Sequence, residues 1–211
     1  MHRDAKAQIM KFTKTKIAAF AFVVSFAASL LPAQAGGLAV RNCTWCHGPS
    51  AQGYTPAPRL AGQRYRYIEH QLTSFARRRR NNPFSRMYMW YAAANLNRET
   101  AHTLAIYFAS LHPEAANDGN QDLVAKGQTI YQQGVPSDNV AACVACHGPR
   151  AQGVGQIPRL GGLSYSYLQD RLGQWKEGYD TAARHPMPHV ASNLSRDQIA
   201  ALASYLSFIG N

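Results

Sequence analysis

The chain has 211 residues, which is enough for one large domain or for two small domains of about 100 residues each. Its formal net charge is +11, but the surplus is uneven. Residues 36–117 hold ten Lys and Arg against three Asp and Glu, whereas residues 118–211 hold seven of each. A basic chain can suit nucleic acid, but the N-terminal segment is typical of exported proteins, which seldom meet nucleic acid. No nucleic-acid partner is therefore expected.

The first 35 residues are predicted to be a secretory signal. Basic residues come first, an apolar run follows at residues 17–31, and Ala33 and Ala35 offer small side chains at the cleavage positions. The run has 15 residues, fewer than the ~20 that a membrane span needs. We expect cleavage after residue 35 and a periplasmic protein, with a retained membrane anchor as the alternative.

All four cysteines lie in two copies of one motif. The copies are Cys43-Thr44-Trp45-Cys46-His47 and Cys143-Val144-Ala145-Cys146-His147, 100 residues apart. The same offset relates many later pairs, and an offset of 98 relates the pairs nearest the end of the chain. Residues 113–121, rich in Ala, Asn, Asp and Gly, are the natural linker. We therefore predict a signal at residues 1–35 and duplicated domains at residues 36–117 and 118–211, with no cysteine left for a structural disulfide.

Both domains are predicted to be helical. Apolar residues at three-to-four spacing predict one amphipathic helix in each domain (Tyr65, Ile68, Leu72 and Phe75; Tyr165, Leu168, Leu172 and Trp175). Ser195 followed by Gln198 is a capping box that starts a last helix, and Asn97 starts the counterpart in the first domain. No run of strand-like alternation is present.

Cysteine, cysteine and histidine at positions i, i+3 and i+4 share one face of a helical turn. Haem fits this pattern, because two thiols can add to the two vinyl groups along one porphyrin edge while the imidazole binds the iron. Thiol redox sites and half-sites for zinc also use paired cysteines, but neither needs an adjoining histidine or a second copy. We therefore predict two covalently attached haem c groups with their iron. Cys43, Cys46, Cys143 and Cys146 attach them, and His47 and His147 are axial ligands.

The second axial ligand decides what each haem does, because His/Met ligation closes the iron site and raises its potential. Met187 is the methionine that follows the second haem motif. The offset of 98 relates it to Met89, which we prefer over Met87 as the ligand in the first domain. His185 and His189 are rivals for the second iron.

Two repeated residues follow each motif. Pro58 and Pro158 lie eleven residues beyond the haem histidines, and we expect their carbonyl groups to bind the ring nitrogen that faces away from the iron. Arg59 and Arg159 are candidates to pair with haem propionates, with a solvated surface charge as the alternative.

These residues resemble class I cytochromes c, and more closely the two-domain cytochrome c4 type. The resemblance rests on both haem motifs, on the two Pro-Arg-Leu segments and on a methionine before an Asn-Leu helix start, and it covers nearly all of residues 36–211. It implies an all-α fold of two tandem class I cytochrome c domains, each with one covalent haem c. It also implies that Gly127 lets the first helix of the second domain cross the helix of Tyr205 closely.

The first domain departs from this family pattern. Only residues 36–42 precede Cys43 in the mature chain, whereas residues 118–142 precede Cys143 in the second domain. The first domain therefore lacks most of the family's N-terminal helix. We expect its last helix, with Tyr107 and Phe108, to leave apolar surface for the second domain, a partner protein or an uncleaved signal to cover.

The sequence predicts an electron-transfer protein and not an enzyme, since no catalytic acid or base accompanies the haem motifs. The resemblance implies a shuttle between respiratory partners such as a dehydrogenase and a terminal oxidase. The alternatives are a cytochrome subunit of a dehydrogenase complex and, less favoured, a dihaem peroxidase or reductase with an accessible iron.

The densest basic region of the chain holds four consecutive arginines, Arg77, Arg78, Arg79 and Arg80. We expect this cluster to face an acidic redox partner or an anionic membrane surface. A solvated loop is the alternative.

Overall fold

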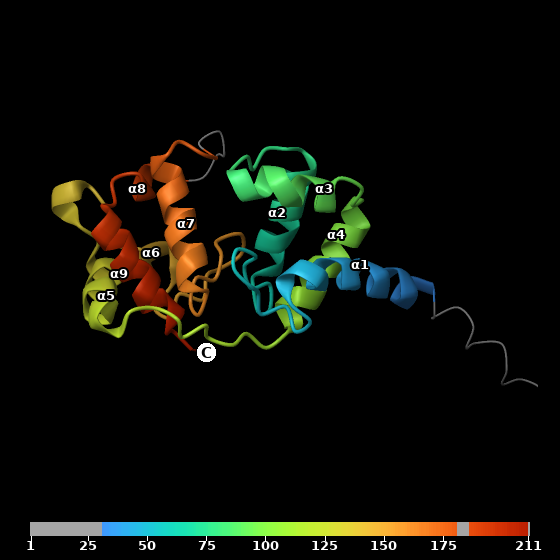
Figure 1. Ribbon diagram of the computed structural model, residues 1–211, viewed down its shortest axis with the longest axis horizontal. Coiled ribbons are helices and arrows are strands. Elements are labelled where there is room, and N and C mark those ends of the chain that lie inside the picture. The colour runs from blue at the N-terminus through green and yellow to red at the C-terminus, as the bar shows by residue number, and fades with distance from the viewer. Residues whose placement is uncertain (1–30, 181–185, 211) are drawn as a thin grey trace, which may run out of the picture.

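The computed structural model of the protein describes residues 31–180 and 186–210, which form two helical domains side by side (Figure 1). The first domain contains α1 (Leu31–His47), α2 (Tyr65–Ala76), the π-helical turn η1 (Ser85–Met89), α3 (Trp90–Ala93) and α4 (Arg98–Ser110). The second contains η2 (Gln121–Leu123), α5 (Val124–Gln133), η3 (Pro136–Asp138), α6 (Val144–His147), α7 (Tyr165–Lys176), α8 (Met187–Ala191) and α9 (Arg196–Ser207). The described residues form isolated β-bridges but no strand, so the all-α prediction is confirmed.

The two amphipathic helices expected from the repeat are α2 and α7. Each buries one apolar face in the core of its own domain (Ile68, Leu72 and Phe75; Leu168, Leu172 and Trp175). In Figure 1 these two helices face each other across the middle of the molecule. The face of each helix that points away from its own core therefore lies where the two domains meet.

The last helix of each domain begins where the capping pattern predicts. The Ser195 side chain accepts from the backbone N–H of Gln198, and the Gln198 side chain accepts from the backbone N–H of Ser195. In the first domain the Asn97 side chain accepts from the backbone N–H of Thr100. These bonds satisfy amide groups that have no partner inside the helix.

The second domain covers its last helix with α5. A Cβ added at Gly127 would lie 2.0 Å from the carbonyl oxygen of Ala201 and 2.6 Å from the Cβ of Tyr205. The small residue therefore permits the close crossing that the family resemblance implies. The rings of Tyr131 and Tyr205 pack beside this crossing, with centroids 5.6 Å apart.

Among the described residues, the first domain has no separate helix in the place of α5. Instead α1 continues without a break into the haem motif, and Ala39 and Val40 pack against the apolar core that contains Phe108. Tyr107 is 39% exposed and its neighbour Ile106 is 47% exposed, which agrees with the apolar surface expected on α4. The same expectation is wrong for Phe108, which is 1% exposed because it packs in the core of the first domain. Helix α1 also crosses the predicted boundary at residue 35, while residues 1–30 lie outside the described part of the chain, so the cleavage stays a prediction.

The domains meet through hydrogen bonds from the first domain to the backbone of the second. Arg64 donates from Nε and Nη2 to the carbonyl oxygen of Gly153, at 3.0 and 2.6 Å. The Gln63 side chain accepts from the backbone N–H of Arg159 and donates to its carbonyl oxygen, at 2.8 and 2.9 Å. These bonds hold the two domains in a fixed relative position. Because the partners in the second domain are backbone groups, the bonds do not depend on which side chains that domain carries there.

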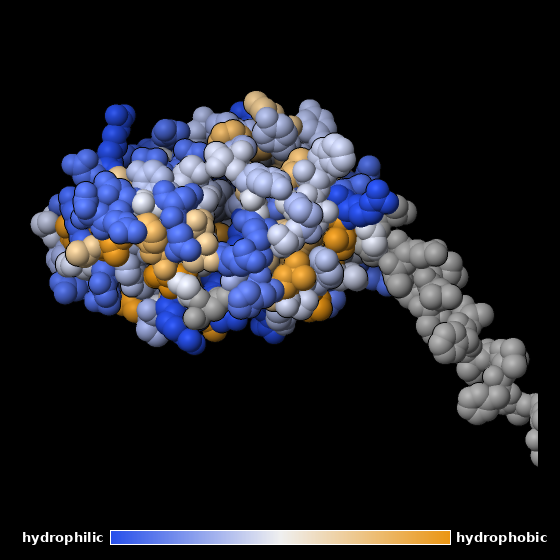
Figure 2. All heavy atoms as spheres, turned by 60° about the horizontal axis from the view of Figure 1, so that its bottom comes forward, coloured by the Kyte–Doolittle hydropathy of each residue, from blue (hydrophilic) through white to orange (hydrophobic). Residues whose placement is uncertain are grey.

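One face of the molecule is mainly polar. The face shown in Figure 2 is predominantly hydrophilic, with small separate apolar areas. In the part of the chain that the structure describes, no helix combines the length and the apolar character that crossing a membrane requires.

Candidate haem sites

Each haem motif ends a helix at an equivalent place in its domain. Cys43 and Cys46 lie in the last two turns of α1, and Cys143 and Cys146 lie at the start of α6 and within it. In both motifs the first cysteine is half-buried and the second is exposed. None of the four is paired in a disulfide bond among the described residues.

The two histidines are held in the form that an iron ligand needs. Nδ1 of His47 lies 2.7 Å from the carbonyl oxygen of Pro58, and Nδ1 of His147 lies 3.0 Å from that of Pro158. A carbonyl oxygen only accepts, so Nδ1 carries the proton and donates it, which leaves the lone pair of Nε2 free for a metal. These are the contacts expected of the two prolines.

Burial also favours the neutral form of the two histidines. Both histidines are about 5% exposed or less, and desolvation lowers the pKa of each ring although the proline carbonyl opposes the effect. The neutral imidazole is therefore the stable form at neutral pH, and only the neutral form binds iron.

The loop after each motif folds back in the same way, which brings the proline to the histidine. Gly48 and Gly148 have φ of 85° and 81°, and Ala51 and Ala151 have φ of 57° and 51°. Left-handed backbone is uncommon for alanine, yet both alanines are fully buried. A Cβ added at Gly53 would lie 2.7 Å from the backbone nitrogen of Arg59, so this position requires glycine.

The cysteines do not have the properties of a redox dithiol or a zinc site. Burial, together with the neighbouring cysteine, raises the pKa of Cys43, and burial raises that of Cys143 to about 11. Reactive thiols need a lowered pKa. Among the described residues, no group of three or more His, Cys, Asp and Glu could hold a metal ion by itself. Attachment to a porphyrin suits these thiols better than either alternative.

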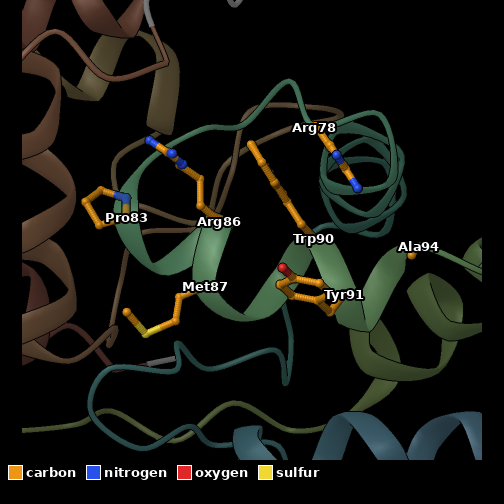
Figure 3. A pocket seen from close by; sticks show the side chains of 7 residues that line it. All are labelled: Arg78, Pro83, Arg86, Met87, Trp90, Tyr91 and Ala94. Carbon is orange, nitrogen blue, oxygen red and sulfur yellow. The ribbon is translucent and has the colours of Figure 1, made fainter.

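The methionines differ in exposure. Met187, at the start of α8, is half-buried and packs against the core of the second domain, and Met89, at the end of η1, is also half-buried. Met87 is 59% exposed, and Figure 3 shows its side chain extending away from η1. Burial is consistent with Met89 and Met187 as iron ligands, an assignment that stays a prediction. His189 is exposed, and His185 lies outside the described residues.

The solvated alternative for Arg59 is wrong. This side chain is 6% exposed and donates to the carbonyl oxygens of Gly161, Gly162 and Glu114, so it ties the first domain to the second and to the linker. Burial and the nearby charge of Arg159 lower its pKa to about 10, which leaves it charged at neutral pH. Arg159 is half-buried, and its role toward a propionate stays a prediction.

Arg80 does not belong to the exposed basic cluster, which corrects that prediction. Its side chain is 11% exposed and donates to Gln71 at 2.9 Å and to Tyr167 at 3.4 Å. The tyrosines Tyr67 and Tyr167 and the carboxylate of Asp180 outweigh the effect of burial and raise the pKa of Arg80. Arg77, Arg78 and Arg79 are exposed, so three arginines of the run face solvent.

Asp180 is the centre of this buried cluster between the domains. It is 2% exposed, accepts from Arg171 at 2.5 Å, and binds Asn81 and Asn82 of the first domain. Burial alone would raise its pKa, but Arg171 and the asparagine bonds lower it. Sequence reasoning missed this cluster, although the offset of 100 already relates Arg80 to Asp180 and Tyr67 to Tyr167.

Comparison with known proteins decides the family. The model of the cytochrome c family matches residues 33–112 and 124–208. The chain belongs to the cytochrome c family. It is 35% identical to cytochrome c4 of Thiocapsa roseopersicina over 78% of this chain and 85% of that protein. It is also 35% identical to the thiosulfate dehydrogenase electron acceptor of Stutzerimonas stutzeri, over 82% and 81%.

A solved structure agrees. The cytochrome c4 structure of Acidithiobacillus ferrooxidans superimposes with a TM-score of 0.74 at 32% identity, covering 79% of this chain and 98% of that one. The protein is thus a cytochrome c4-like, dihaem electron-transfer protein with two covalent haem c groups, one in each domain. Bound haem supplies a one-electron couple at its iron. The protein's own residues attach the porphyrin, keep the imidazole neutral and fix its orientation.

Proposed function

We propose that the protein is a periplasmic shuttle that takes electrons from a dehydrogenase and delivers them to a respiratory acceptor. The pairing of two equivalent sites carries this proposal, because each site holds a neutral histidine against a proline carbonyl and the domains are locked together by polar contacts. A rigid pair of one-electron centres suits transfer between partners. The relative named as an electron acceptor of thiosulfate dehydrogenase supports a dehydrogenase as donor.

A redox titration of the purified holoprotein with near-infrared spectra tests this function. In the oxidised protein, two haems with His/Met ligation should each show a methionine-to-iron charge-transfer band. Carbon monoxide added to the reduced protein should leave the visible absorption of both haems unchanged. A haem that binds carbon monoxide readily has an open iron, and that result contradicts a simple shuttle.

Periplasmic location needs its own experiment. We expect mass spectrometry of the exported holoprotein to find a chain that begins at Gly36 and carries two porphyrin masses. A chain that keeps residues 1–35 after export would instead be anchored.

A second candidate is a cytochrome subunit of a dehydrogenase complex. The exposed Ile106 and Tyr107 on α4 favour it, because the equivalent face of α9 is covered by α5. Gentle solubilisation followed by size-exclusion chromatography distinguishes the candidates. A free shuttle elutes at the mass of one chain, and a subunit elutes with its enzyme.

A further inference from the structure

The first domain has a surface that is rich in arginine and aromatic side chains. Between Glu69 and Glu99 the chain has six arginines and no acidic residue. Arg80 points inward, but Arg77, Arg78, Arg79 and Arg86 are exposed. Tyr91, close to them in the chain, is 77% exposed. We call these five residues together with Trp90 the arginine surface.

An open cavity of about 500 Å³ lies within this surface. Arg78, Arg86, Trp90 and Tyr91 line it, and Figure 3 shows the Trp90 ring between the two arginine side chains. The guanidinium carbons of Arg78 and Arg86 lie 5.6 and 5.9 Å from the centre of the Trp90 ring. Two positive groups therefore border one concave site.

The indole of Trp90 is itself held in place. Its Nε1–H donates to the carbonyl oxygen of Arg80 at 2.8 Å, and Arg80 is anchored in the buried cluster with Asp180. A fixed ring restrains both guanidinium groups by cation–π contact, so less side-chain entropy is lost when they bind a partner. The site is thus organised before any partner arrives.

The chemistry of the site favours a carboxylate. Arginine presents a planar fork of donors that matches a carboxylate in two parallel bonds. The acidic residue seen to contact this segment, Asp180, is 2% exposed and already bound by Arg171, so it leaves the positive charge of the surface unbalanced. A concave site also suits a protruding protein side chain better than a flat lipid surface.

We propose that the arginine surface docks the acidic face of a redox protein, with an acidic side chain of that protein entering the cavity between Arg78 and Arg86. This inference rests on the proposed shuttle function. The segment that lines the cavity also carries Met87 and Met89. A partner docked there would contact the segment of the first domain that carries the axial methionine expected for the haem of this domain.

The test compares two double variants of the holoprotein. Arg78→Gln with Arg86→Gln removes two charges from the cavity, and Lys126→Gln with Arg196→Gln removes two exposed charges from the second domain. The probe is flavodoxin hydroquinone, an acidic one-electron donor, and stopped-flow absorbance follows haem reduction. At low ionic strength we expect the cavity variant to react about tenfold more slowly and the control less than about twofold more slowly. At about 1 M salt, where charges are screened beyond ~3 Å, the difference should disappear.

Three outcomes overturn the docking site. Equal slowing in both variants would show that net charge alone matters, and no slowing in the cavity variant would show that the cavity is not used. Sedimentation with phosphatidylglycerol vesicles gives the third outcome. In that outcome the wild-type protein binds the vesicles and the cavity variant does not, while the two proteins react equally fast with flavodoxin. The arginine surface would then bind lipid and not a redox protein.

A small uncharged reductant separates this inference from the proposed function. Durohydroquinone, a small uncharged reductant with a potential below that of a His/Met haem, should reduce all the proteins at equal rates, because it needs no charged docking surface. If the haems of the wild-type protein cannot be reduced by it, the shuttle function itself fails, whatever the arginine surface does.

Discussion

The two domains build the haem site alike but cover their last helix differently. The histidine, proline carbonyl and buried left-handed alanine recur in nearly the same geometry. By contrast, α9 is crossed by α5 at Gly127, whereas α4 is partly covered by the N-terminal continuation of the haem helix itself. The comparison shows that the contacts around the imidazole constrain the duplicated sequence more strongly than the packing on the far side of the fold.

The charges have diverged as well. An offset of 100 relates Arg80 to Asp180, and these two opposite charges lie 4.0 Å apart across the domain boundary. Two identical domains would place like charges together there. The positive surplus of the first domain is instead left at its outer arginine surface.

The largest effect is expected from the axial methionines, and it tests whether the domains are equivalent at the iron. Met187→Leu and Met89→Leu should each remove about half of the methionine-to-iron near-infrared band and lower one potential by on the order of 0.1 V. Met87→Leu is the matched control and should leave both unchanged. If Met87→Leu removes the band and Met89→Leu does not, the repeat register fails at this position.

The next largest effect is expected from Asp180→Asn, which removes the negative charge that the second domain contributes to the buried cluster between the domains. Asp180→Asn leaves Arg171 and Arg80 buried without a carboxylate, so we expect the free energy of unfolding to fall by about 3–5 kcal/mol. Asp122→Asn, at an exposed position, should change it by less than about 0.5 kcal/mol. Denaturant unfolding of the holoproteins measures both.

The same carboxylate should make stability depend on pH. The pKa of Asp180 is lower in the folded protein than the ~3.9 of an unfolded chain, so its contribution is complete above that value. It is lost as the pH falls below about 4, through the folded pKa. The wild-type protein should therefore lose more stability than Asp180→Asn on acidification from neutral pH to about pH 3. Parallel curves would show that Asp180 is not ionised in this way.

Local sequence patterns predicted much of this structure. The capping residues Ser195 and Asn97 fixed two helix starts, and the haem motif with its proline fixed the contacts of each histidine, because these interactions join residues close in sequence. The inward turn of Arg80 could not be predicted in that way. It has the same side chain as Arg79, and its environment comes from Asp180 in the other domain.

A smaller effect is expected from exchanging equivalent residues of the two last helices. Ser204 is fully buried and accepts from the backbone N–H of Asn120, whereas Ile106, its equivalent at an offset of 98, is 47% exposed. Ser204→Ile should cost about 2–4 kcal/mol through overpacking and an unsatisfied amide. Ile106→Ser should cost less than about 0.5 kcal/mol. A large cost for Ile106→Ser in the purified protein would mean that something covers α4 after all.

The smallest effects concern the crossing that only the second domain is seen to have. Gly127→Ala places a methyl group against the Ala201 carbonyl, and backbone cannot move aside as a flexible side chain can, so we expect a loss of about 1–3 kcal/mol. Gly173, within α7, is the matched control, because a Cβ there meets nothing within 4 Å. Gly173→Ala should stabilise the protein by about 0.5–1 kcal/mol, since alanine restricts the unfolded chain. Equal responses in thermal unfolding would mean that α5 does not press on α9, and the two domains would then differ less than their sequences imply.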